Sequence, residues 1–158
     1  MLLESIIPLY YTDIDIWEDL LHNGIGNILN HRWEASLPHI PGDIREAIGE
    51  CGLHDWIVSS ISVFREDSIR VQIDVNHAGT ARTLVFDQIK QFNISGDFSL
   101  DGLIFPTCNG DQPGIAQILD IWISYEKDIE YAILLNNHRY IRIVTRAPKK
   151  KRNKTKDQ

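Results

Sequence analysis

The sequence has few of the residues with which proteins build disulfides or membrane spans. Its 158 residues include two cysteines, Cys51 and Cys108, which do not form a CxxC pair. No apolar stretch approaches the roughly 18 residues of a membrane helix. The N-terminus has an early Glu4 and no basic residue, which makes it a poor secretory signal. We therefore expect no membrane association and a cytoplasmic protein with reduced thiols.

Motifs for metals and cofactors are also missing. The glycine-rich residues 96–114 contain neither GxGxxG nor a Gly-Lys-Ser/Thr triplet, so they do not predict a phosphate-binding loop. The six histidines show no HxxxH spacing and no pairing with clustered carboxylates. We expect no metal and no cofactor.

Basic residues are scarce over most of the chain. Residues 1–148 contain 10 Lys and Arg against 21 Asp and Glu, a net charge of −11, although the whole chain carries −6. An acidic body argues against nucleic acid and suits a basic protein partner, whose approach its field would accelerate. Solubility alone explains the same acidity, and both interpretations stay open.

The positive charge is concentrated at the C-terminus. Six of the 16 basic residues lie in residues 149–158, with Asp157 as the one acid there. This stretch has no apolar residue to bury, so we predict a disordered basic tail over residues 147–158 and a single domain over residues 1–146. Such a tail is typical of a nuclear import signal, of an arm for nucleic acid or anionic lipid, or of a solvated terminus with no role of its own.

What the sequence does contain is a series of short strands joined by turns, over about residues 53–145. The clearest part, residues 118–145, predicts a three-stranded antiparallel meander. Helical patterns come before the strands, within residues 12–52. This segregation predicts an α+β fold in which N-terminal helices pack on a mostly antiparallel, meander-rich sheet.

The helices have recognisable ends. The first is predicted over residues 12–24, capped by Thr12 and stopped by Gly24. Its apolar stripe consists of Ile14, Trp17, Leu20 and Leu21. Residues 25–36 suggest a further helical piece with weak boundaries, and Pro41 can open a last helix that ends near residue 51. The strands before the meander are predicted at residues 53–64, 69–75, 82–86 and 89–94, with one more at 100–105.

Alternation fixes the register of the meander. A three-residue connection pairs Tyr125 with Ile129 and puts the apolar sets of the first two strands on one face, whereas a two-residue turn would separate them. The same reasoning pairs Ile133 with Ile141. The residues predicted to share this face are Leu119, Ile121, Ile123, Tyr125, Ile129, Tyr131, Ile133, Leu135, Ile141 and Ile143.

The opposite face of the meander carries a mixture of polar and aromatic side chains, so it is either solvated or covered by the N-terminal region. We take it as the candidate binding surface, and Asp120, Glu126 and Glu130 as the acids that would contact a basic partner. The candidate binding residues on this face are Asp120, Trp122, Glu126, Glu130 and Tyr140.

Two places invite a catalytic hypothesis. His54 and Asp55 are adjacent, but neighbouring strand residues point to opposite faces, so we expect no dyad and a structural role at the helix-to-strand corner. Cys108 lies in a turn-rich loop without a basic neighbour to lower its pKa, so we expect a tolerated thiol and no catalytic residue.

Several short stretches resemble a loose group of small bacterial proteins of unknown function. They are Trp33, Leu37–Pro38, Leu53–His54–Asp55, Leu84–Phe86 and Ile121–Glu126. The resemblance covers residues 33–145 and implies a helical N-terminal part on a β-rich core. Some members of that group are similar to immunity proteins of bacterial toxin systems. The shared motifs are structural, so no catalytic residue carries over, and Trp56 replaces the small residue usual after the His-Asp pair.

Three functions remain open from the sequence. The first is a non-catalytic cytoplasmic interaction protein that binds a basic protein, such as an immunity-type inhibitor of a bacterial toxin. The second is an enzyme whose site combines His54, Asp55 or Cys108 with the loop at residues 95–117. The third is a small-ligand or regulatory domain that uses the mixed face around Trp122 and Tyr140.

Overall fold

Helices and strands occupy separate parts of the chain. The computed structural model describes residues 2–49, 52–95, 105–106, 113–114, 116–136 and 138–148. The helical part consists of α1 (Leu2–Tyr10), α2 (Ile14–Leu20), the π-helical turn η1 (Leu21–Ile25), α3 (Gly26–Ser36), the 3₁₀ turn η2 (Leu37–His39) and α4 (Gly42–Ile48). The strands are β1 (Ile57–Arg65), β2 (Ile69–His77), β3 (Thr80–Phe86), β4 (Ile89–Ile94), β5 (Phe105–Pro106), β6 (Pro113–Gly114), β7 (Ala116–Tyr125), β8 (Asp128–Leu135) and β9 (Arg139–Arg146). The predicted α+β class is confirmed.

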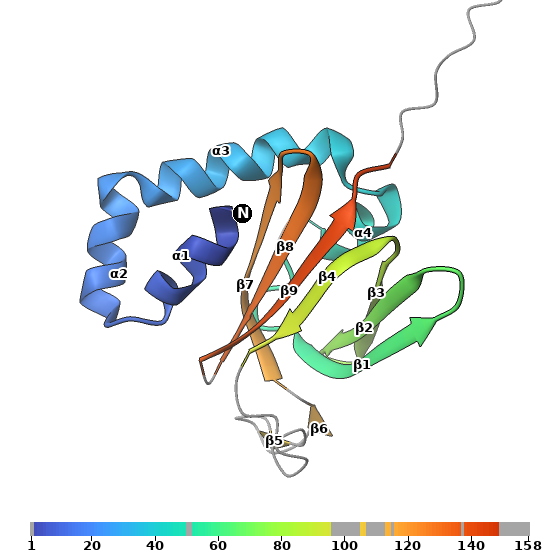
Figure 1. The fold of residues 1–158 in the computed structure, drawn as a ribbon. Coiled ribbons are helices and arrows are strands. Elements are labelled where there is room, and N and C mark those ends of the chain that lie inside the picture. The colour runs from blue at the N-terminus through green and yellow to red at the C-terminus, as the bar shows by residue number, and fades with distance from the viewer. Residues whose placement is uncertain are drawn as a thin grey trace, which may run out of the picture.

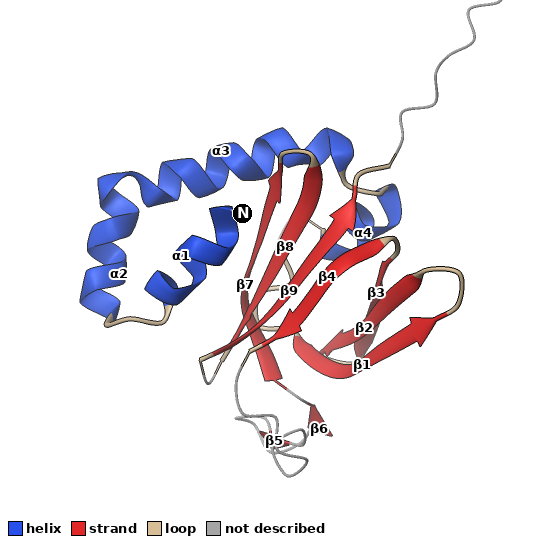
Figure 2. Cartoon of the chain, viewed as in Figure 1, coloured by secondary structure: helices blue, strands red, loops and turns tan. Residues whose placement is uncertain are grey.

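Seven strands form one antiparallel sheet in the order β3-β2-β1-β7-β8-β9-β4. β5 and β6 pair separately. The sheet is strongly coiled, so that β1, β2 and β3 turn away from the meander of β7, β8 and β9 (Figure 1). α1 and α2 lie on one side of the meander, and α3 crosses its end (Figure 2).

The register of the meander is as predicted. Tyr125 pairs with Ile129, and Ile133 pairs with Ile141. One residue departs from the pattern, because a register shift lies between Ile118 and Asp120. Ile118 therefore takes the core position, and Leu119, predicted to lie on this face, is displaced from it.

Each face of the meander contributes to a separate core. On the inner face of the coiled sheet, Tyr131 packs edge-to-face on Phe86 with ring centroids 4.9 Å apart, and α4 closes this core. On the outer face, Trp122, Ala132 and Leu134 are covered by apolar residues of α1 and by Trp17 of α2. The outer face is thus covered in large part by the N-terminal region, which was one of the two arrangements that the sequence allowed.

The N-terminal helices differ from the expected ones. α1 was not predicted, although Leu3, Ile6 and Ile7 follow helical spacing and are buried. α2 is capped by Asp13, whose carboxylate accepts a hydrogen bond from Asp15 N at 2.8 Å, and not by Thr12. Gly24 does interrupt the helical path, with φ of 117° between α2 and α3.

The long strand predicted from residue 53 begins only at Ile57. Residues 52–55 form a turn in which Leu53 and Asp55 have positive φ angles of 56° and 67°. Leu53 accepts this conformation because its side chain is buried in the inner core. His54 therefore lies in a turn and not, as predicted, in a strand.

Candidate functional site

The structure separates the five candidate binding residues. Glu130 is 0% exposed and Trp122 is 6% exposed. Tyr140 is half-buried, whereas Asp120 and Glu126 are exposed residues. In this fold Glu130 and Trp122 are interior residues, so Asp120, Glu126 and Tyr140 are the members of the set that a partner could reach.

Glu130 anchors α1 to the sheet. Its carboxylate accepts a hydrogen bond from Leu3 N at 2.9 Å and one from Arg142 Nε at 2.7 Å. Arg142 also donates to Gln91 Oε1 at 2.9 Å, and its Nη2 lies 3.6 Å from the carboxylate of Glu4. The carboxylate of Glu130 therefore has its partners inside the protein, so Glu130 is not one of the acids that could attract a basic partner from solution.

Asp120 is fixed against the ring of Trp122. Its carboxylate accepts hydrogen bonds from Trp122 Nε1 and from Ile121 N, each at 2.9 Å. Asp120 as a whole is exposed, but neighbouring residues displace water from its carboxylate. This burial raises the pKa of Asp120, whereas the two hydrogen bonds lower it, and the effect of burial is the larger. Burial, with the nearby charge of Asp120 as a smaller cause, also raises the pKa of Tyr10.

The N-terminal helices leave a hollow against the start of β7, which we call the outer groove. It has a volume of about 490 Å³ and is lined by Tyr10, Tyr11, Thr12, Ile14, Trp17, Glu18, Leu21, Leu119, Leu135, Asn136 and His138. Its walls come from the end of α1, from α2 and η1, from the bulged start of β7 and from the β8–β9 turn.

Aromatic contacts and one hydroxyl hold this groove in shape. The ring of Tyr10 makes edge-to-face contacts with Trp17 at 5.2 Å and with Trp122 at 5.4 Å, measured between centroids. The Tyr11 hydroxyl accepts a hydrogen bond from Leu135 N at 3.2 Å and lies against the carbonyl oxygens of Leu135 and Arg139. The outer groove is therefore built from rigid parts.

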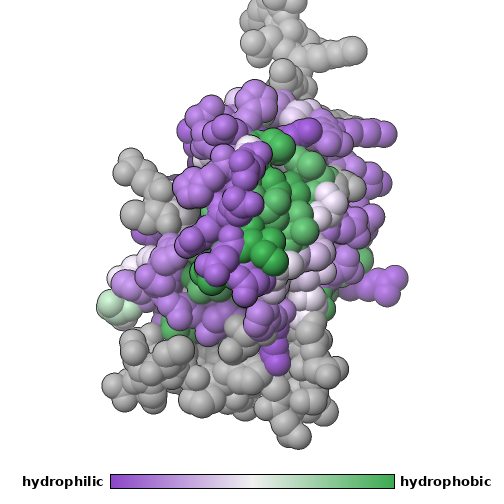
Figure 3. All heavy atoms as spheres, turned by 90° about the vertical axis from the view of Figure 1, so that its left-hand side faces the viewer, coloured by the Kyte–Doolittle hydropathy of each residue, from purple (hydrophilic) through white to green (hydrophobic). Residues whose placement is uncertain are grey.

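The outer groove combines apolar and acidic surface. Ile14 at its edge is 69% exposed, and Ile16, also on α2, is 54% exposed. Figure 3 views this side of the molecule and shows apolar residues gathered within a hydrophilic surround. Ile14 and Ile16 alternate with acids in the sequence, which was a signal for this surface, but Ile14 was assigned to the apolar stripe of the first predicted helix.

Glu126 lies at the opposite end of β7 from the outer groove. It forms an ion pair with Arg32 of α3 at 3.3 Å, in which the side chain of Arg32 is 33% exposed and that of Glu126 is 53% exposed. Exposed pairs of this kind contribute little stability. Glu126 and Asp120 thus do not form one contact surface.

His54 and Asp55 do touch, contrary to the expectation from strand geometry. His54 Nδ1 lies 3.1 Å from Asp55 Oδ2, because both residues belong to the turn at residues 52–55 and not to an alternating strand. Asp55 also has a structural part at this corner: its N–H donates to Ile118 O at 2.9 Å, and its Oδ1 accepts from Gln117 Nε2 at 2.8 Å. More than half of each side chain of the pair is exposed.

The remaining catalytic candidate is Cys108 with the loop at residues 95–117. Cys108 and most of this loop lie outside the described residues, as do Cys51 and the tail from residue 149. Within the part of the chain that the structure describes, no three His, Cys, Asp or Glu side chains converge in a way that could hold a metal ion. None of the helices described has both the length and the apolar character needed to cross a bilayer.

Comparison with known proteins adds no relative. No family model matches the chain, and neither the curated proteins nor the solved structures contain a significant match.

Proposed function

We propose that this chain is a non-catalytic interaction protein of the cytoplasm that binds a basic protein partner through the outer groove, as an immunity-type inhibitor covers a toxin. The observation that carries the proposal is the combination of exposed isoleucine with the exposed acids of α2 beside the outer groove. Protein interfaces typically place such apolar anchors within a polar rim.

Exposed acids lie along α2, which forms one wall of the outer groove. α2 and its cap supply Asp13, Asp15, Glu18 and Asp19, and no Lys or Arg precedes Arg32 in the sequence. A basic partner would meet this field before contact, which raises association rates. The resemblance to immunity-type proteins points to the same class of function.

The partner surface that fits is basic with an apolar side chain at its centre. Ile14 and the aromatic walls of the outer groove would bury that side chain, while the acids of α2 would face Lys or Arg at the rim.

Two double variants of equal charge test this proposal. Ile14→Arg with Glu18→Arg alters the outer groove, and Val63→Arg with Glu66→Arg alters the β1–β2 hairpin, on the far side of the sheet from α2 (Figure 1). Val63 is 56% exposed, close to the value for Ile14, and both variants add the same positive charge.

The assay is affinity capture from lysate of the source organism, followed by binding measurements on the captured protein after purification. We expect a basic protein whose affinity falls at least about tenfold in the groove variant and stays near the wild-type value in the hairpin variant. Equal losses in the two variants would assign binding to net charge alone, and no loss in either would remove the outer groove from the interface.

A further inference from the structure

A second hollow lies on the other side of the molecule, between η2 and α4. It has a volume of about 650 Å³, within the range usual for small-molecule sites. Its lining residues are Trp33, Leu37, Ile40, Gly42, Arg45, Glu46, Ile48, Gly49 and Ile123. We call it the η2–α4 hollow.

The floor of the η2–α4 hollow is apolar and belongs to the inner core. Ile40, Ile48 and Ile123 are 8%, 3% and 1% exposed, and Trp33 and Leu37 form half-buried walls. The apolar part of a ligand would therefore displace water from an apolar surface that is already rigid in the protein.

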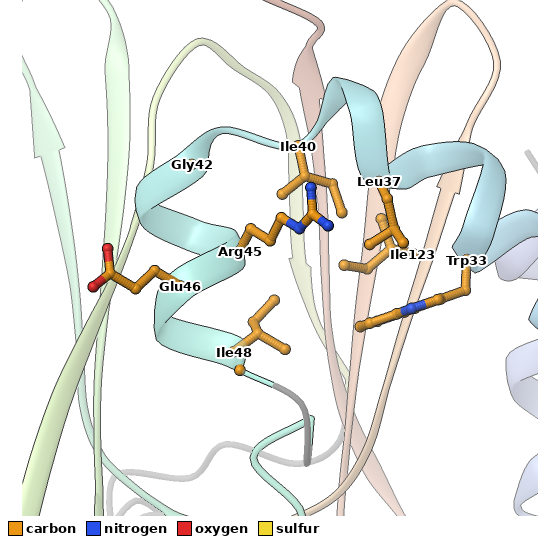
Figure 4. A pocket seen from close by; sticks show the side chains of 9 residues that line it. Trp33, Leu37, Ile40, Gly42, Arg45, Glu46, Ile48 and Ile123 are labelled. Carbon is orange, nitrogen blue, oxygen red and sulfur yellow. The ribbon is translucent and has the colours of Figure 1, made fainter.

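A single cationic side chain is directed into this apolar space. Arg45 points from α4 across the hollow, toward Ile40 and Leu37, whereas Glu46 points away from it (Figure 4). No hydrogen bond or ion pair joins the Arg45 guanidinium to another described side chain. A guanidinium so placed presents two parallel N–H donors, the geometry that fits a carboxylate.

α4 is held in place from its other side, so the hollow is not produced by a loose helix. Arg82 of β3 donates from Nη1 to Ala47 O at 2.9 Å, and its guanidinium carbon lies 4.7 Å from the ring centroid of Trp56. Ile44 and Ile48 of α4 are buried in the inner core. The spacing between Arg45 and the apolar walls is thus set by packing.

We propose that the η2–α4 hollow binds a small amphipathic monocarboxylate, with its apolar body against Trp33, Leu37 and Ile123 and its carboxylate on Arg45. This site is separate from the outer groove, and binding there does not depend on the proposed partner. It also places a small-ligand function away from Trp122 and Tyr140, where the sequence alone suggested it.

The probe is sodium octanoate, with 1-octanol as its neutral counterpart, titrated into the isotopically labelled full chain. The four tryptophan indole N–H signals in ¹H–¹⁵N spectra report on different places: Trp33 on the η2–α4 hollow, Trp17 and Trp122 on the outer face, and Trp56 on the opposite side of α4. We expect octanoate to shift the Trp33 signal in a saturable manner and to leave the signals of Trp17 and Trp122 in place.

Arg45→Gln and Asp43→Asn form the matched pair of variants. Both residues are exposed on α4, and Asp43 does not line the hollow, so neither substitution removes core packing. We expect Arg45→Gln to weaken octanoate binding about tenfold and Asp43→Asn to leave it unchanged or strengthen it slightly, since one negative charge is lost. In the wild-type chain, 1-octanol should bind about as weakly as octanoate binds to Arg45→Gln.

Two results would overturn the proposal. An unshifted Trp33 signal at millimolar octanoate would mean that the hollow does not accept such a ligand. Equal affinity of octanoate for the wild-type chain and Arg45→Gln, or equal affinity of octanoate and 1-octanol, would mean that Arg45 does not recognise a carboxylate.

Discussion

At the scale of single residues, Glu130 and Arg142 form an ion pair in the interior of the protein. Both side chains are at most 2% exposed, and they meet at 2.7 Å. Two charges taken out of water need each other, because either one alone would stay buried without compensation. The stability of the fold should therefore be sensitive to the replacement of a single carboxylate oxygen of Glu130 by an amide nitrogen.

Glu130→Gln should destabilise the fold by about 3–5 kcal/mol, because Arg142 keeps its charge and loses its counter-charge. Urea denaturation measures the loss. Glu126→Gln is the matched control: Glu126 is exposed and its partner Arg32 is only partly buried, so we expect a loss of less than about 1 kcal/mol. Similar losses in the two variants would contradict the burial of Glu130.

The contribution of Asp74 to the stability of the fold should depend on pH. The Ser60 hydroxyl at 2.7 Å, and then that of Thr83 at 2.8 Å, donate to its carboxylate and lower the pKa of Asp74. As the pH falls below the ordinary aspartate pKa of about 3.9, the unfolded chain takes up the proton first. The stability contributed by these hydrogen bonds is therefore present above that value and lost as the pH drops through the folded pKa.

Ser60→Ala combined with Thr83→Val should cost about 0.5–1 kcal/mol at pH 7, a value reduced by solvent screening of this surface site. The gap to the wild-type chain should close toward pH 2. Urea titrations at several pH values measure both quantities, and Thr83→Ser, which keeps its hydroxyl, should behave like the wild-type chain. A gap that persists unchanged at pH 2 would show that packing, and not the hydrogen bonds to Asp74, causes the loss.

Alternation predicted which residues of the meander face the inner core, since period-two spacing alone determines that face. It did not predict that Glu130 is buried, because a polar residue on the opposite face is expected to be solvated unless the element that covers it is known. That cover is α1. In the register of β8 and β9, Glu130 pairs with Val144 and Arg142 pairs with Ala132, so the two charges are diagonal neighbours on one face, and this was a signal that they could be buried together.

At the scale of elements, α1 is the piece on which the outer core depends. Leu3 and Ile7 are 0% and 1% exposed against Trp122, Ala132 and Leu134. Deletion of residues 1–12 should uncover Trp122, shift tryptophan fluorescence to longer wavelength and lower the unfolding midpoint in urea. Truncation after Arg146 serves as the control and should leave both readings unchanged. A deletion of residues 1–12 with wild-type fluorescence would mean that α1 does not cover the sheet in solution.

Strands with strong alternation were predictable as elements, and those at residues 69–75, 82–86 and 89–94 are β2, β3 and β4 with small changes at their ends. α1 was missed because its run of apolar residues was weighed only as an export signal. The turn at residues 52–55 was missed because Leu53 adopts a positive φ that its residue type does not indicate, and tertiary packing imposes it.

At the scale of the whole molecule, the charge is segregated in the sequence, with an acidic body before residue 149 and a basic stretch after it. In the structure, α2 and its cap carry exposed acids beside the outer groove, whereas two acids on the sheet side form ion pairs, Asp87 with Arg70 and Asp128 with Lys90. Negative charge near an exposed apolar side chain is what a docking surface for a basic protein needs. Net charge was readable from the sequence, but its position beside an exposed hollow was not.

The central claim is that this acidic surface steers a basic protein partner into the outer groove. The most direct measurement is the association rate of the captured and purified partner at 0.01 M and 0.15 M salt, where the Debye length falls from about 30 Å to about 8 Å. We predict that the rate falls at least about tenfold over this range, and that truncation after Arg146, which removes six positive charges and one negative, maintains or raises it. A rate that does not depend on salt, or capture of nucleic acid alone through the tail at residues 149–158, would contradict the claim.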